Sequence, residues 1–220
     1  YKIYCIGACK NTIFLNIRRS IFYLLSTNVG EILILLSSLI VGLPLPLTAV
    51  QILWINLITD STGALALAVE PKHINVKSHQ PRSPGEGILV RSNYQRIILV
   101  AVIMTLGTMW FYYSSISTGE SIIKARSLAF ITMAVFQIIN LYNCRSMKTS
   151  IFKIKVFSNK WLIYSIIISS LLTIMTTQVD FMRQIFDTVS LSLMEWFKII
   201  LVGLSLIVLV EIDKAIRKYY

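Results

Sequence analysis

The sequence predicts an all-α integral membrane protein in which six transmembrane helices form a bundle. Of its 220 residues, 55% are hydrophobic and only 14% are charged, and the mean hydropathy is +0.71. A soluble domain usually has about a quarter of its residues charged. The apolar residues are concentrated in runs of about twenty, the length of helix needed to cross a bilayer. The basic residues collect between alternate runs.

Each of the six apolar runs is expected to be α-helical, because a helix satisfies all its backbone hydrogen bonds internally. The second run is interrupted by polar residues, and the fourth contains Gln137 and Asn140. We expect residues 13–220 to form one membrane domain, with residues 1–12 unassigned. The predicted spans are 21–42, 47–69, 94–115, 126–143, 160–178 and 193–212.

The distribution of positive charge predicts the topology. If the segment before the first span is cytoplasmic, 17 of the 21 lysines and arginines lie on the cytoplasmic side. Lys124, Arg126 and Arg183 lie on the other side, and Lys198 lies inside the last span. This asymmetry predicts a multi-pass protein with both termini cytoplasmic, in the cell membrane if the source is prokaryotic. The net charge of +11 then reflects topology and contact with membrane lipid rather than binding to nucleic acid.

Two carboxylates fall well inside predicted spans, where a charged side chain is expensive and usually functional. Glu31 lies three residues after Asn28, so both share one face of the first helix. In the second span, Asn56, Thr59 and Asp60 are spaced i, i+3 and i+4, which again places them on one face.

The link between these two helices, "VGLPLPL", is short and apolar, so we expect an antiparallel hairpin with both polar faces at similar depth. This would gather carboxylate, amide and hydroxyl oxygens, the donors that hard cations such as Ca²⁺ prefer. Gln137 and Asn140 could add carbonyl oxygens from the fourth span. Gly30 in the first helix and Gly63 in the second are expected to disturb helix regularity near the cluster.

Other interpretations of these residues remain open. The amides and hydroxyls could hydrogen-bond across helices and hold the bundle together without binding an ion. Two nearby carboxylates need a cation or a proton to coexist, so proton binding is a second possibility. His73 and His79 lie six residues apart in the polar loop 70–92, and no cysteine or carboxylate cluster accompanies them, which argues against a metal site there.

Several stretches resemble P-type calcium-transporting ATPases over nearly the whole chain. "NIRRSIFYLLSTNVGEI", "LPLTAVQILWINLITDS" and "ALAVEP…QPRSPGEGIL" look like the fifth and sixth transmembrane helices and the loop that follows. "TMAVFQIINLYNCRS" resembles the eighth helix, and "EWFKIILVGLSLIVLVEIDKAIRKY" the tenth. The resemblance implies that the six helices correspond to helices five to ten of such a pump.

The resemblance also implies which residues ligate the ion. Sodium/potassium pumps typically have a second Asp where this chain has Asn56, which favours the calcium branch. Gln137 occupies a position where two-site pumps have Glu, so a different stoichiometry is plausible. The implied metal ligands are Asn28, Glu31, Asn56, Thr59, Asp60 and Gln137.

The motifs that handle ATP in this family do not occur in the sequence. "DKTGT", "TGDN" and "GDGxND" are absent, and "TGE" at 118–120 lies in a short loop between spans. We therefore expect the chain to be inactive by itself, with ATP and Mg²⁺ bound only by an N-terminal half that is joined to it or is a separate chain. The alternatives are a non-catalytic remnant or structural membrane protein, and a pump for Na⁺, Mn²⁺ or Mg²⁺.

Overall fold

A computed structural model describes residues 2–71, 91–147 and 150–219, with side chains of 2–11, 91–92, 156 and 218–219 excepted. Within these residues all regular structure is helical, as predicted. The longer elements are α1 (Lys2–Val41), α2 (Ala49–Trp54), η1 (Ile55–Asp60), α3 (Ser61–Ala68), α4 (Arg91–Ser117), α5 (Ile122–Asn143), α6 (Lys160–Gln178), α7 (Asp180–Phe186) and α8 (Leu193–Tyr219). Two single 3₁₀ turns, η3 (Ile151–Lys153) and η4 (Val156–Ser158), lie between α5 and α6.

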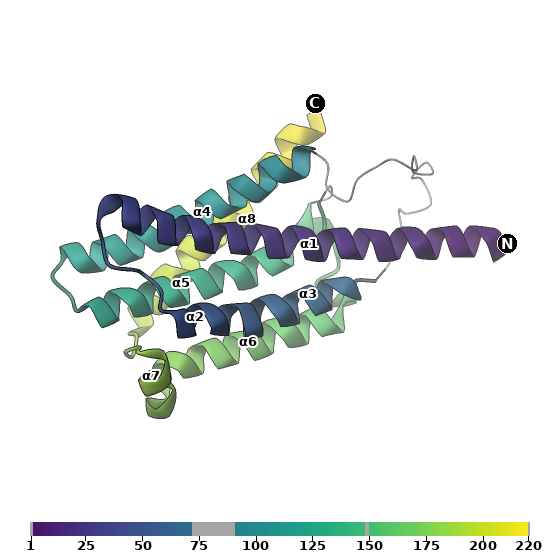
Figure 1. The fold of residues 1–220 in the computed structure, drawn as a ribbon. Helices are drawn as coiled ribbons and strands as arrows, with labels where there is room; N and C mark the ends of the chain where they lie inside the picture. Colours follow the sequence, from purple (N-terminus) through teal and green to yellow (C-terminus); the bar gives the residue numbers. More distant parts are fainter. Residues whose placement is uncertain (1, 72–90, 148–149, 220) are drawn as a thin grey trace.

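The described residues include six helical segments that are long and apolar enough to cross a membrane, which confirms the predicted bundle. The second of these, Ala49–Ala68, consists of α2, η1 and α3 in series. Figure 1 shows the two termini at one end of the bundle, as an even number of spans requires, and the turn between α4 and α5 at the other. The first helix begins at Lys2, well before the predicted span at 21, and its first turns extend beyond the bundle.

Helix α5 forms the centre of the bundle. It packs against α4, α6 and α8, and it is the most buried of the six spans. Its side chains Phe130, Met133 and Phe136 are fully buried in the main apolar core, together with Ile34 of α1 and Met104 of α4. A helix buried on all sides is apolar all round, apart from positions that meet polar partners. Polar residues on α5 therefore face other helices rather than lipid.

The connection between α1 and α2 is held in place by two long side chains. Tyr112 donates its hydroxyl hydrogen to the carbonyl of Pro44 (2.6 Å), and Arg126 donates from Nε to the carbonyl of Leu45 (3.0 Å). Helix α7 closes the same end of the bundle, where Phe186 packs edge-on against Trp54. These contacts fix the depth at which the second span enters the bundle.

The helix irregularity lies at a different place from the one expected. Helix α1 runs through Gly30 without a break, and Gly63 lies within regular α3. The irregular turn is η1, a π-helical segment in which the amide of Ser61 bonds to the carbonyl of Asn56, five residues back. Gly63 instead allows close packing, since a Cβ there would lie 3.1 Å from Leu141 and Tyr23 side-chain atoms.

Small residues also bring α4, α5 and α8 together, as is usual in membrane bundles. A Cβ on Gly107 of α4 would lie 2.5 Å from the ring of Phe136, and one on Gly203 of α8 would lie 2.7 Å from Ile139. Phe136 is fully buried, so its ring has no room to withdraw. The two glycines therefore set the spacing between these helices.

We predict that Gly107→Ala destabilises the bundle, because overpacking a close helix contact typically costs about 1–3 kcal/mol. The measurement is thermal unfolding of the purified chain in detergent. Gly30→Ala is the matched control, because its Cβ would lie no closer than 3.4 Å to side-chain atoms of Met133 and Met104, which is ordinary van der Waals contact. Equal unfolding temperatures for the two variants would contradict this account.

Candidate ion site within the bundle

Glu31 of α1 lies at the centre of a buried polar cluster formed by three helices. Its side chain is almost fully buried, and its two carboxylate oxygens each accept one hydrogen bond from an amide. Asn56 of η1 donates from Nδ2 to Oε2 (3.0 Å), and Gln137 of α5 donates from Nε2 to Oε1 (2.9 Å). The carboxylate therefore connects α1 to both neighbouring spans.

Asp60, the last residue of η1, is the second buried carboxylate. Thr27 of α1 donates its hydroxyl hydrogen to Asp60 Oδ2 at 2.7 Å. The other oxygen, Oδ1, is buried and has no hydrogen-bond partner, and the same holds for Oε1 of Gln137. Buried acceptors are normally hydrogen-bonded, so two such oxygens in one bundle call for an explanation.

The other polar residues predicted from the sequence do not bond to either carboxylate through their side chains. Asn28 is half-buried, and its Nδ2 donates within α1 to the carbonyl of Leu24 (2.7 Å). The side chain of Thr59 is buried, and its carbonyl accepts a bond from the hydroxyl of Tyr23 (3.4 Å). Asn140 of α5 is buried one turn from Gln137 and donates from Nδ2 to Ser26 Oγ (2.9 Å).

The π turn is held from outside by hydroxyl groups of α3 and α6. Thr62 and Ser169 both donate to the carbonyl of Ile58, and Ser165 donates to Thr62 Oγ1 at 3.1 Å. A π turn widens the helix and leaves carbonyls without their usual intrahelical partner, and such turns are frequent at functional sites. The hydroxyls satisfy this carbonyl and so stabilise the geometry that presents Asn56 and Asp60.

A second buried polar cluster lies where α3 and α5 end, at the same end of the bundle as the two termini (Figure 1). Arg145 contacts Glu70 Oε1 through Nη2 (2.9 Å) and Nε (3.0 Å), and both side chains are at most 1% exposed. Asn159, which caps α6, donates from Nδ2 to Glu70 Oε2 (2.6 Å). Asn16 of α1 donates to the backbone carbonyl of Glu70 (2.9 Å). This clamp fixes the end of the second span against α1, α5 and α6.

Sequence reasoning found both carboxylates and the two amides that bind Glu31, but it missed Thr27, Ser26 and the Glu70–Arg145 pair. Thr27 lies four residues before Glu31, so helical spacing could have indicated it. Glu70 and Arg145 are 75 residues apart, and no local pattern connects them.

His73, His79 and most of the loop 70–92 lie outside the described residues. Among the described residues, no three His, Cys, Asp or Glu side chains form a metal-ligating group.

Sequence comparison places the chain in a family. The sequence pattern of the family described as "Cation transporting ATPase, C-terminus" matches residues 44–216, which include most of the bundle. The chain belongs to this family. Its relatives identify it as a C-terminal domain of the calcium-pump type of P-type ATPase and, with its six apolar helices, as a multi-pass integral membrane protein.

The curated relatives come from bacteria, a yeast and mammals. The calcium-transporting ATPase of Bacillus subtilis (strain 168) is 36% identical over 199 residues, which are 89% of this chain. The probable cation-transporting ATPase F of Mycobacterium tuberculosis is 29% identical over 91% of the chain. The calcium-transporting ATPase type 2C member 2 of Mus musculus is 31% identical over 94%. The chain spans 22% of the length of each of these relatives.

We predict that Arg145→Ala strongly destabilises the chain, because removing one partner of a buried ion pair typically costs about 3–5 kcal/mol. Unfolding by denaturant titration in mixed micelles measures this loss. Arg183→Ala is the matched control, because its i,i+3 partner Asp180 is largely exposed and such pairs contribute about 1 kcal/mol or less. A small effect of Arg145→Ala, equal to that of the control, would refute the role of the clamp.

Proposed function

We propose that this chain is the ion-binding and translocation part of an ATP-driven Ca²⁺ pump, and that Asn28, Glu31, Asn56, Thr59, Asp60 and Gln137 supply the cation ligands. ATP hydrolysis would require an N-terminal part with the phosphorylation and nucleotide-binding domains, as one chain or as a separate subunit. Both termini would face the cytoplasm, as the positive charge distribution favours.

The observation that supports the proposal most directly is the pairing of two buried carboxylates with unused oxygens. Glu31 and Asp60 lie on adjacent helices inside the bundle, and Asp60 Oδ1 and Gln137 Oε1 have no hydrogen-bond partner. Two carboxylates buried together favour the uptake of a cation, which neutralises their charge and accepts lone pairs from several oxygens.

The amides give the site a second supporting feature. The NH₂ groups of Asn56 and Gln137 now donate to Glu31, and each amide also has a carbonyl oxygen that can ligate a cation. Rotation of either amide by about 180° would turn its carbonyl oxygen toward a bound cation in place of the NH₂ group, and no helix would have to move. The site can thus satisfy Glu31 both with and without an ion, which a pump that binds and releases its cargo requires.

Ca²⁺ is favoured over other cations by the donor set and by the names of the relatives. Ca²⁺ takes six to eight oxygens in flexible geometry, whereas Mg²⁺ demands near-ideal octahedral coordination and keeps its waters. Flexible amides from three helices suit the first requirement. Na⁺ and Mn²⁺ remain competitors that a binding experiment separates.

We predict that Asp60→Asn lowers the Ca²⁺ affinity of the chain by at least about tenfold, because it removes one of two charges that attract the ion. Equilibrium binding of radioactive Ca²⁺ to the chain in lipid nanodiscs measures the affinity, with Na⁺, Mn²⁺ and Mg²⁺ as competitors. Asp180→Asn is the matched control, since Asp180 lies outside the cluster and is exposed. Unchanged Ca²⁺ binding in Asp60→Asn would rule out the ligand assignment, and stronger binding of a competing ion would rule out Ca²⁺.

Gln137→Glu tests the contribution of α5. A third carboxylate beside Glu31 is expected to raise the affinity for Ca²⁺ or the number of ions bound per chain, most clearly at alkaline pH where all three are ionised. The same binding assay, repeated at two pH values, measures both quantities. If neither changes, Gln137 is a hydrogen-bond donor to Glu31 and not a ligand.

A further inference from the structure

A groove of about 220 Å³ lies between the last turns of α4 and the first turns of α8, with the α4–α5 turn as its rim. It is at the end of the bundle remote from both termini, away from the carboxylate cluster (Figure 1). Its lining includes Trp110 and Ser114 of α4, Glu120 of the turn, and Glu195 and Lys198 of α8. The lining therefore combines charged, polar and aromatic side chains.

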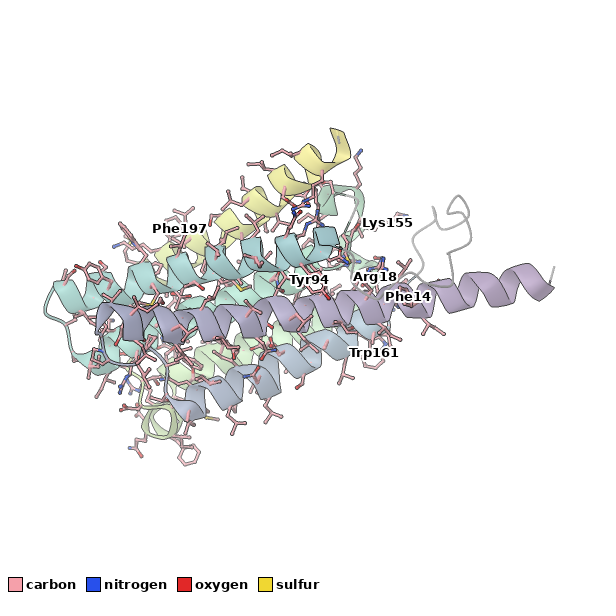
Figure 2. All side chains as sticks on the ribbon, turned by 45° about the horizontal axis from the view of Figure 1, so that its top comes forward. Phe14, Arg18, Tyr94, Lys155, Trp161 and Phe197 are labelled. Carbon is pink, nitrogen blue, oxygen red and sulfur yellow. The ribbon has the colours of Figure 1, made fainter. Side chains whose placement is uncertain are left out.

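The groove opens on the lipid-facing surface. Trp110 is 70% exposed and Phe197 is 63% exposed, and apolar side chains of both helices continue around them. Figure 2 shows Phe197 on the outer side of α8, away from α1. In a membrane this surface is covered by lipid, and an exposed Trp near a helix end is typical of the headgroup level. Lipid headgroups therefore reach the mouth of the groove.

The charges in and beside the groove are ordered by depth. Glu195 forms an ion pair with Lys124 (2.5 Å), and Glu120 lies just beyond the end of α4, where it accepts a hydrogen bond from Ser115. Lys198 lies three residues further along α8, about 4.5 Å deeper. The outer level thus has an excess of one negative charge, and the deeper level has one positive charge.

Lys198 is exposed and forms no ion pair within the described part of the chain, although it lies inside the last span. A lysine at this depth is costly unless it extends to the headgroups or meets an anion. A phosphate group at the membrane surface is the anion that lipid supplies at this level.

We propose that the groove between α4 and α8 binds the headgroup of an amino-phospholipid, with the phosphate at Lys198 and the primary ammonium at Glu120. In such lipids the ammonium lies further from the bilayer centre than the phosphate, which matches the order of the charges. A primary ammonium donates three hydrogen bonds to carboxylates, whereas a choline headgroup donates none. The proposal is independent of ion binding at Glu31 and Asp60.

The test is the binding of single lipids to the full chain, purified in detergent and measured by native mass spectrometry. Phosphatidylethanolamine is expected to bind more tightly than phosphatidylcholine or phosphatidylglycerol of the same acyl chains. Lys198→Gln should weaken its binding about tenfold through the loss of a charge-assisted bond to phosphate. Glu120→Gln should remove the preference for phosphatidylethanolamine over phosphatidylcholine.

Lys160→Gln is the matched control, because Lys160 is an exposed lysine at the first turn of α6, at the other end of the bundle. It should bind phosphatidylethanolamine as the unmodified chain does, and unfolding temperatures without added lipid should be the same for all three variants. Equal binding of phosphatidylcholine or phosphatidylglycerol to the unmodified chain would overturn recognition of the ammonium. Equal loss in Lys160→Gln and Lys198→Gln would overturn the site itself.

Discussion

The burial of two carboxylates inside an apolar bundle is the constraint on which the rest of this structure depends. Lipid offers no hydrogen bonds, so each carboxylate oxygen must find a donor in the protein or a cation. Glu31 finds two amides, from η1 and from α5, and Asp60 finds the hydroxyl of Thr27. These bonds require three helices to meet at one depth, and they determine how α1, the second span and α5 are aligned.

Local features of the second span make that alignment possible. Its π turn changes the direction in which Asn56 and Asp60 point, and hydroxyls from α3 and α6 satisfy the carbonyl of Ile58 within this turn. At its end, Glu70 is fixed by Arg145 and Asn159. The irregular turn thus lies between a tightly held end and a closed α1–α2 connection, so the surrounding bundle maintains its geometry.

The candidate site was largely predictable, because carboxylates and amides at helical spacing in apolar segments are visible in the sequence. The bond between Asn56 and Glu31 joins the two spans of the expected hairpin, and Gln137 reaches Glu31 from α5, as a donor rather than through its carbonyl oxygen. Helical spacing could place Thr27 on the polar face, but it did not show that Thr27 bonds to Asp60 or that Asn28 bonds to the carbonyl of Leu24 in its own helix. Hydroxyls and amides have several possible partners on a helix, and only the rotation of one helix against another selects among them.

Hydropathy and helical periodicity are local properties, so the number of spans, their approximate positions and the residues that bring charge into the membrane follow from the sequence alone. Tertiary structure alone decided where the second span is irregular, and it gave Gly63 a close-packing role instead of the expected flexible one. It also decided that Glu70 meets Arg145 across 75 residues. These outcomes depend on which surfaces touch, and contacts between distant segments exist only after the helices have packed.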